Sequence, residues 1–81
     1  METRSRMLDY LYKNKEENPT RNFDGEREKM LEHLKVEEIH MEFNAEYLHM
    51  AGLIKIDRII NQKWKFVKIT RLGMDEVERY K

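Results

Sequence analysis

The 81-residue chain contains no cysteine, one proline and three glycines, and its formal net charge is zero. The lack of cysteine excludes a disulfide framework, thiolate metal sites, iron–sulfur clusters and a cysteine nucleophile. No apolar run approaches the roughly 18 residues of a membrane-spanning helix, and the first residues lack the apolar core of a signal peptide. We therefore expect a cytoplasmic protein with no membrane partner.

Groups for catalysis or for a cofactor are also scarce. The three glycines are too far apart for a phosphate-binding loop, and the three histidines are spaced for no compact metal site. Glu46-x-x-His49, preceded by Glu42, has the carboxylate–histidine spacing of di-iron bundles, but the second copy that such a site requires is missing. We expect no enzyme, no cofactor, no metal and no small-molecule substrate.

The zero net charge hides a separation of charges along the chain. Residues 35–52 carry one basic and four acidic side chains, a net −3. Residues 53–72 carry six basic side chains and one acidic side chain, a net +5. An acidic block is thus followed directly by a basic one, which a globally neutral composition does not reveal.

Hydrophobic periodicity predicts three helices in the first two thirds of the chain. The first spans about residues 4–15, with Met7, Leu8, Leu11 and Tyr12 on one face. A loop around Pro19 follows, and Asp24 is a candidate N-cap for a second helix over about 25–34. The third spans about 37–51 and ends at Gly52, a residue suited to positive φ.

After Gly52 the pattern changes to that of strands. Leu53 to Asp57 alternates, and Trp64 to Ile69 is rich in β-branched and aromatic residues, which predicts a hairpin that turns around residues 61–63. Thr70 then offers an N-cap for a short helix over about 71–80. The expected fold class is α+β, in one domain over residues 1–81.

The second half of the chain contains Leu48-x-x-Ala51-Gly52-Leu53-Ile54, then the expected hairpin, then Ile69-Thr70-x-x-Gly73. This pattern resembles the winged-helix (winged helix-turn-helix) superfamily, in particular its small prokaryotic and viral members. It covers about residues 41–80, whereas residues 1–40 agree in helix number only. Two departures are Arg71, where members often have proline, and a turn at Leu34-Lys35-Val36 without glycine. The resemblance implies three helices, a two-stranded wing, a short C-terminal helix and a DNA-binding, transcription-regulatory role.

In winged-helix DNA binders the third helix enters the major groove. Spacing of 100° per residue predicts that the core face of this helix is formed by Val36, Ile39, Phe43, Tyr47 and Met50. A second apolar arc holds Met41, Ala45 and Leu48. The remaining sector carries Glu38, Glu42, Glu46 and His49. Three aligned carboxylates would be repelled by phosphates, so this sector is either a solvated acidic face or a surface for a protein partner.

The basic hairpin is therefore the predicted contact with double-stranded DNA. The candidate residues are Lys55, Arg58, Lys63, Trp64, Lys65 and Lys68. Cations next to an aromatic ring suit phosphate contact with stacking. The alternative is that the lysines protect edge strands from aggregation while Trp64 packs in the core. Two functions thus remain open, a DNA-binding regulator acting through a basic wing and a non-catalytic adaptor docking through the acidic third helix. A homodimer is compatible with both.

Overall fold

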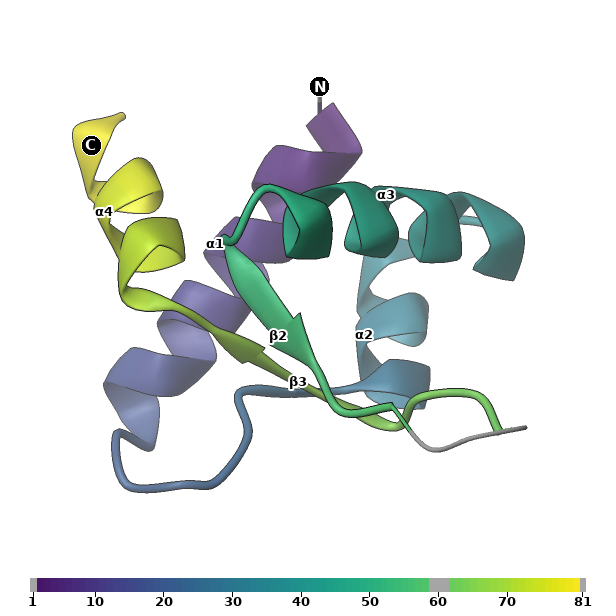
Figure 1. The fold of residues 1–81 in the computed structure, drawn as a ribbon, viewed down its shortest axis with the longest axis horizontal. Helices are drawn as coiled ribbons and strands as arrows, with labels where there is room; N and C mark the ends of the chain where they lie inside the picture. The colour runs from purple at the N-terminus through teal and green to yellow at the C-terminus, as the bar shows by residue number, and fades with distance from the viewer. Residues whose placement is uncertain (1, 59–61, 81) are drawn as a thin grey trace.

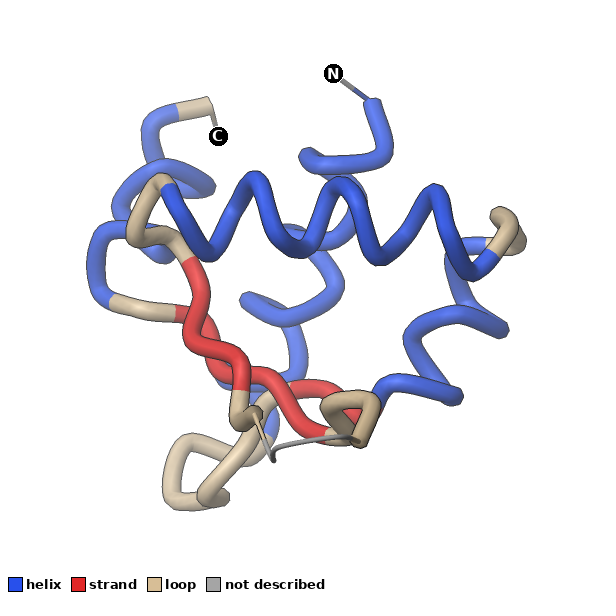
Figure 2. The backbone as a smooth tube through the Cα atoms, turned by 45° about the vertical axis from the view of Figure 1, so that its right-hand side comes forward, coloured by secondary structure: helices blue, strands red, loops and turns tan. Residues whose placement is uncertain are grey.

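The computed structural model describes residues 2–58 and 62–80, which form four helices and a three-stranded sheet (Figure 1; Figure 2). In chain order the elements are α1 (Glu2–Glu17), β1 (Gly25–Glu26), α2 (Arg27–Leu34), α3 (Glu38–Met50), β2 (Ile54–Ile56), β3 (Phe66–Ile69) and α4 (Arg71–Arg79). This confirms the α+β class, the helices and the hairpin. The turn expected at residues 61–63 begins outside the described residues.

The sheet contains a strand that the sequence did not predict. Its order is β1-β3-β2 and both pairs are antiparallel, with Gly25 opposite Val67 and Ile54 opposite Ile69. Asp24 was expected to cap the second helix, and this is wrong. Its buried carboxylate instead accepts a hydrogen bond from the Ile69 N–H at 2.9 Å, and its own N–H donates to the Val67 carbonyl. These two hydrogen bonds join the chain at Asp24 to β3 before α2 begins.

The core lies between α1, α3 and the inner face of the sheet. Figure 2 shows α3 running above the strands, with the other helices beside and behind it. The fully buried side chains of large volume come from every layer, and they are Met7, Leu11, Met30, Leu34, Met41, Leu48, Ile54, Val67 and Asn44. At the carboxyl end, the Tyr12 hydroxyl of α1 donates to a carboxylate oxygen of Glu78 in α4 at 2.7 Å, which raises the pKa of Tyr12 to about 12.

The face of α3 that enters the core differs from the predicted one. Met41, Asn44, Ala45 and Leu48 are buried, whereas Ile39, Phe43, Tyr47 and Met50 are exposed. Of the predicted core arc, only Val36 packs against the core. Both arcs are apolar, and Ala45, the small residue of the buried arc, is fully buried. The buried Asn44 is satisfied by Arg4 of α1 and by the His40 carbonyl, at 3.0 and 2.8 Å.

The junction between α3, the sheet and α4 matches the sequence pattern. Gly52 has φ of 79°, as expected, and Thr70 is the N-cap of α4. The Thr70 hydroxyl accepts from the Gly73 N–H at 3.0 Å and donates to the Gly52 carbonyl at 2.7 Å. At Gly73 the backbone of α4 comes so close to the residue before β2 that an added Cβ would lie 2.2 Å from the Leu53 carbonyl oxygen.

We expect Gly73→Ala to lower the free energy of unfolding by about 1–3 kcal/mol, although alanine favours helices, because the new methyl group overlaps backbone that cannot move aside. Urea unfolding followed by circular dichroism measures the change. Asp75→Ala, at an exposed site in the same helix, is the control and should stay within about 0.5 kcal/mol of wild type. An alanine at position 73 that stabilises the protein would contradict this packing.

Candidate nucleic-acid interface

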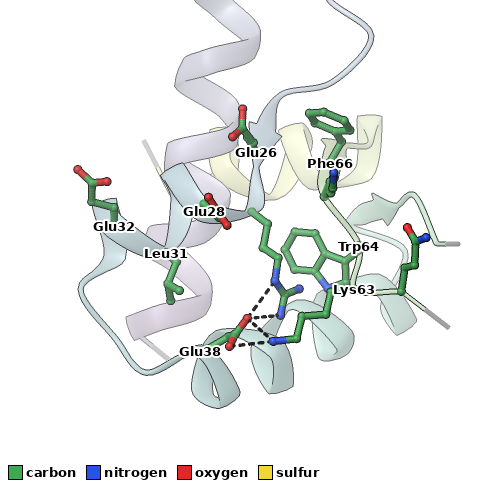
Figure 3. Close-up of a pocket in the computed structure, with 11 residues that line it drawn as sticks. Glu26, Glu28, Leu31, Glu32, Glu38, Lys63, Trp64 and Phe66 are labelled. Atoms are coloured by element: carbon green, nitrogen blue, oxygen red, sulfur yellow. Dashed lines mark hydrogen bonds and ion pairs between the residues drawn. The ribbon is translucent and has the colours of Figure 1, made fainter.

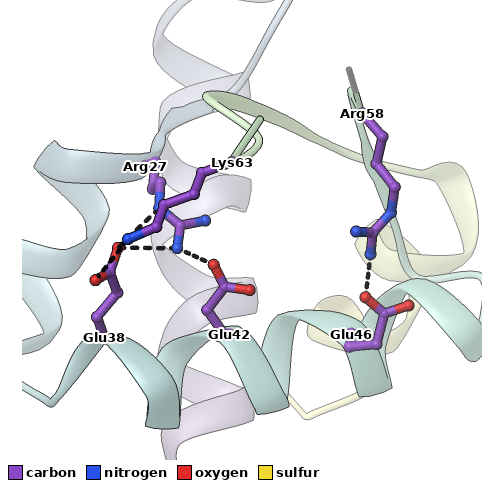
Figure 4. A network of polar contacts seen from close by, with 6 residues as sticks. All are labelled: Arg27, Glu38, Glu42, Glu46, Arg58 and Lys63. Carbon is purple, nitrogen blue, oxygen red and sulfur yellow. Dashed lines mark hydrogen bonds and ion pairs between the residues drawn. The ribbon is translucent and has the colours of Figure 1, made fainter. Parts of the chain in front are cut away.

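The acidic row of α3 (Glu38, Glu42 and Glu46) lies against basic side chains of α2 and of the β2–β3 hairpin (Figure 4). Glu38 accepts from the Nη2 of Arg27 at 2.9 Å and from the Nζ of Lys63 at 3.0 Å. Glu42 also pairs with Arg27, and Glu46 pairs with Arg58. The two charged blocks of the sequence therefore meet in the fold, and part of each neutralises the other.

Arg27 is the buried member of this network and was not singled out from the sequence. Only 7% of its side chain is exposed, and its guanidinium lies 4.6 Å from the centroid of the Trp64 ring. Planar guanidinium groups stack on aromatic faces while they donate in plane to carboxylates. The row of three carboxylates on one helix face was a signal in the sequence that could have indicated Arg27. Such a row is stabilised when cations from other elements pack against it.

The structure corrects the stacking role expected for Trp64. The residue is 3% exposed and packs in the core, with Arg27 against its ring. Its ring is not accessible to a base in this conformation. A bulky aromatic ring contributes more to stability when it is buried than when it is solvated in a hairpin, which is the physical reason for this placement. His49 is also engaged internally, since its Nδ1 lies 3.3 Å from the Ile54 carbonyl oxygen at the start of β2.

Lys55, Lys65 and Lys68 remain exposed, and no described carboxylate forms an ion pair with them. Lys55 and Lys68 are directly opposite each other in the β2–β3 ladder, on the face that points away from the core. Like charges in that position repel each other. Lys68 lies on β3, the central strand, where protection of a sheet edge cannot explain a lysine.

A groove of about 550 Å³ adjoins this lysine pair. The loop before β1 contributes Arg21 and Phe23, which sequence reasoning missed because that loop looked like a simple connection. The Arg21 guanidinium lies 4.4 Å from the Phe23 ring centroid, and the Phe23 and Phe66 rings are 4.4 Å apart. We call Arg21, Lys55 and Lys68 the basic sheet face. Asp57 is the acidic side chain among the residues that line this groove.

A larger pocket of about 910 Å³ lies between α2 and the hairpin (Figure 3). Its lining includes Arg27, Trp64, Lys63 and Lys65, and Figure 3 shows Trp64 next to Lys63. Four glutamates outnumber these cations along the lining: Glu26, Glu28, Glu32 and Glu38. A phosphate group would meet this negative charge, so the basic sheet face is the better site for an anion.

Two further properties concern only the described residues. No three His, Asp or Glu side chains among residues 2–58 and 62–80 come together as a possible metal site. Within the same residues, no helix is both long enough and apolar enough to cross a bilayer.

Comparisons with solved structures identify the fold. A proposed DNA-binding protein of Ralstonia eutropha JMP134 superposes with a TM-score of 0.83 and 14% identity, over 99% of this chain and 95% of that chain. MepR of Staphylococcus aureus, a transcription regulator of the multidrug efflux pump MepA, gives a TM-score of 0.74 and 18% identity over 96% of this chain and 53% of MepR. MepR in the MepR–DNA complex gives a TM-score of 0.76 and 18% identity, over 99% of this chain and 60% of that chain. The chain has a winged-helix fold.

This chain therefore spans little more than half of MepR. No protein-family model and no curated protein matches the sequence. In winged-helix terms, the β2–β3 hairpin is the wing and α3 occupies the position of the recognition helix. The outer surface of α3 is apolar beside its ion-paired acidic row, and Lys55, Lys65 and Lys68 of the hairpin have no ion-pair partner among the described carboxylates.

The contact between the wing and α3 changes the pKa of Glu38. The hydrogen bond from Lys63, followed by that from Arg27, lowers the pKa of Glu38 below its ordinary value of 4.5. Because the pKa is lower in the folded protein than in the unfolded chain, this carboxylate stabilises the fold above pH 4.5. That contribution is lost as the pH falls through the folded-state pKa.

We expect Lys63→Ala to raise the pKa of Glu38 toward its ordinary value, since it removes the largest of the causes. Carbon-detected NMR titration of the glutamate carboxyl groups measures the shift. Lys65→Ala, an exposed neighbour with no ion pair to Glu38, is the matched control and should leave that pKa unchanged. An unchanged Glu38 pKa in Lys63→Ala would show that Lys63 does not contact Glu38 in solution.

Proposed function

We propose that this chain is a DNA-binding, transcription-regulatory protein that contacts the phosphate backbone through the exposed cations of its wing and sheet. The observation that carries this proposal is the pair Lys55 and Lys68, opposite each other on the outer face of the sheet. A cross-strand pair of like charges costs stability, and neither lysine has an ion-pair partner among the described carboxylates. An anionic ligand offsets that cost.

The cations of the wing divide into two groups by availability. Lys55, Lys65 and Lys68 are free to reach a phosphate, and Arg21 adds a fourth cation beside the lysine pair. Arg58 and Lys63 are held by glutamates of α3 and would have to exchange partners. In this proposal Trp64 acts through the core, by supporting the segment that leads into β3. The expected DNA contact is therefore the sheet side of the wing, and α3 contributes little.

The comparisons support this reading at the level of fold. MepR is a transcription regulator with a solved DNA complex, and the domain of this chain superposes on part of it. Backbone contacts through a few lysines give affinity that depends strongly on salt and weakly on sequence. We accordingly expect modest sequence preference unless a second element reads base edges.

The alternative, an adaptor that docks through Glu38, Glu42, Glu46 and His49, is less well supported. The three carboxylates already satisfy cations of the same chain, and His49 contacts Ile54. A basic partner would need to displace Arg27, which is buried, or Arg58 and Lys63 of the wing. Each new ion pair with the partner would break an existing ion pair within the chain. Binding through the acidic row would therefore gain little free energy.

Binding to duplex DNA at about 50 and 200 mM salt tests the proposal, because phosphate contacts give a steep decrease of log K with log salt concentration. We expect Lys55→Glu/Lys68→Glu to weaken binding and to reduce the magnitude of the salt slope by about 2. Fluorescence anisotropy with a labelled duplex measures both quantities.

The matched control is Lys13→Glu/Lys29→Glu, which changes the net charge equally at exposed sites on α1 and α2. It should retain the wild-type slope. Equal losses in both double variants would show a nonspecific charge effect. Absence of any salt-dependent binding by the wild type would refute the proposed function.

The same lysine pair predicts a trade-off between stability and binding. Lys68→Glu replaces a repulsive cross-strand pair by an attractive one, so we expect a gain in stability of about 0.2–1 kcal/mol together with weaker DNA binding. Urea unfolding and anisotropy measure the two effects on one preparation. Lys65→Glu is a useful comparison, since it removes a wing cation without a described cross-strand partner. A loss of stability in Lys68→Glu would contradict repulsion between the two lysines.

A further inference from the structure

The outward face of α3 carries large apolar side chains that the described chain leaves half or more exposed. Ile39, Phe43, Tyr47 and Met50 are 77, 64, 50 and 80% exposed, and we call them the apolar stripe. They recur at helical spacing over almost the whole of α3, which spans Glu38–Met50. Single exposed apolar residues are ordinary, whereas a contiguous row on one helix marks an interaction surface.

The stripe is bordered by charged side chains that already have partners in the same chain. Along one edge run Glu42 and Glu46, each in an ion pair with a basic residue of the same chain. At the other edge Arg4 lies with its guanidinium 3.4 Å from the Tyr47 ring centroid and donates to Asn44. Along the edge of Glu42 and Glu46, a basic partner would find no unpaired carboxylate, and an identical surface would meet no uncompensated negative charge.

The order of side chains along the stripe is suited to pairing with itself. The aromatic residues Phe43 and Tyr47 lie in the middle, and the aliphatic residues Ile39 and Met50 lie at the ends. In an antiparallel arrangement about a two-fold axis, Phe43 meets Tyr47 of the second copy and Ile39 meets Met50 of the second copy. Such an interface is isologous, and antiparallel helices also align their dipoles favourably.

The area is sufficient for a specific dimer of moderate affinity. Four large side chains at these exposures offer on the order of 600 Å² per copy. Two copies would bury roughly 1,200 Å², the lower end of the range for specific interfaces. We propose that the apolar stripe is the contact with a second copy of this chain, with the two α3 helices packed antiparallel.

This inference goes beyond the proposed function and does not rest on it. The dimer would bury the helix at the recognition position and leave the basic sheet face of both copies accessible. A failure of dimerisation would leave DNA binding through the wing untouched. A failure of DNA binding would likewise leave the dimer contact standing.

Sedimentation equilibrium of the full chain between about 5 and 500 µM tests the contact, because an interface of this size is expected to dissociate in that range. We expect a monomer–dimer equilibrium for wild type and a dissociation constant at least tenfold larger for Phe43→Glu. Phe43 is 64% exposed, so the thermal midpoint at low concentration should stay near that of wild type and show that the variant folds.

Leu72→Glu is the matched control, since Leu72 is 61% exposed but lies on α4 outside the apolar stripe. It should dimerise like wild type. A wild type that stays monomeric over the whole range, or equal weakening by both variants, would overturn the proposal and assign the stripe to a different partner or to none.

The lack of cysteine permits a test of orientation. In the antiparallel dimer, a mixture of Phe43→Cys and Tyr47→Cys chains should form disulfide-linked dimers between the two variants faster than either variant alone. Mass spectrometry distinguishes the mixed product from the two self-linked products. Faster self-linking of Phe43→Cys would indicate parallel helices and overturn the antiparallel arrangement.

Discussion

The packing of this small protein depends on one buried cation. Arg27, the first residue of α2, places its guanidinium between the Trp64 ring and the carboxylates of Glu38 and Glu42. A buried charge is tolerated only where partners and hydrogen bonds compensate its loss of hydration. Glutamates of α3 must therefore face α2 and the wing, and this sets the rotation of α3 about its own axis. Met41, Ala45 and Leu48 then enter the core, and the apolar stripe is left outside.

The same interaction decides which charges remain for a partner. Lys63 and Arg58 join Arg27 on the acidic row, so two of the five candidate cations of the wing are already paired within the chain. Trp64, the aromatic candidate, is buried. What stays available is the basic sheet face together with Lys65. The segment-by-segment charge count thus overstates the free positive charge of the wing, because neighbours in space cancel charges that are separate in sequence.

The winged-helix fold and the surface chemistry of this chain point to different uses of α3. In a DNA-reading winged helix, α3 presents polar and basic side chains to the groove. Here that helix presents a neutralised acidic row and an apolar stripe. A fold does not by itself determine function. Because of the side chains that each element presents, we place the proposed nucleic-acid contact on the sheet and not on α3. These side chains also give α3 a different proposed role, as a contact between two copies.

Much of the fold could be predicted from local sequence. Helix periodicity, the Thr70 cap and the glycine before β2 are short-range signals, and each has the predicted structure. Strand β1, the role of Asp24, the partners of the acidic row and the buried face of α3 could not be predicted this way. Each depends on contacts between residues far apart in the chain. Periodicity gives the angles between the faces of a helix but not which face turns inward. Where two apolar arcs compete, as in α3, only close packing and the pairing of buried charges decide.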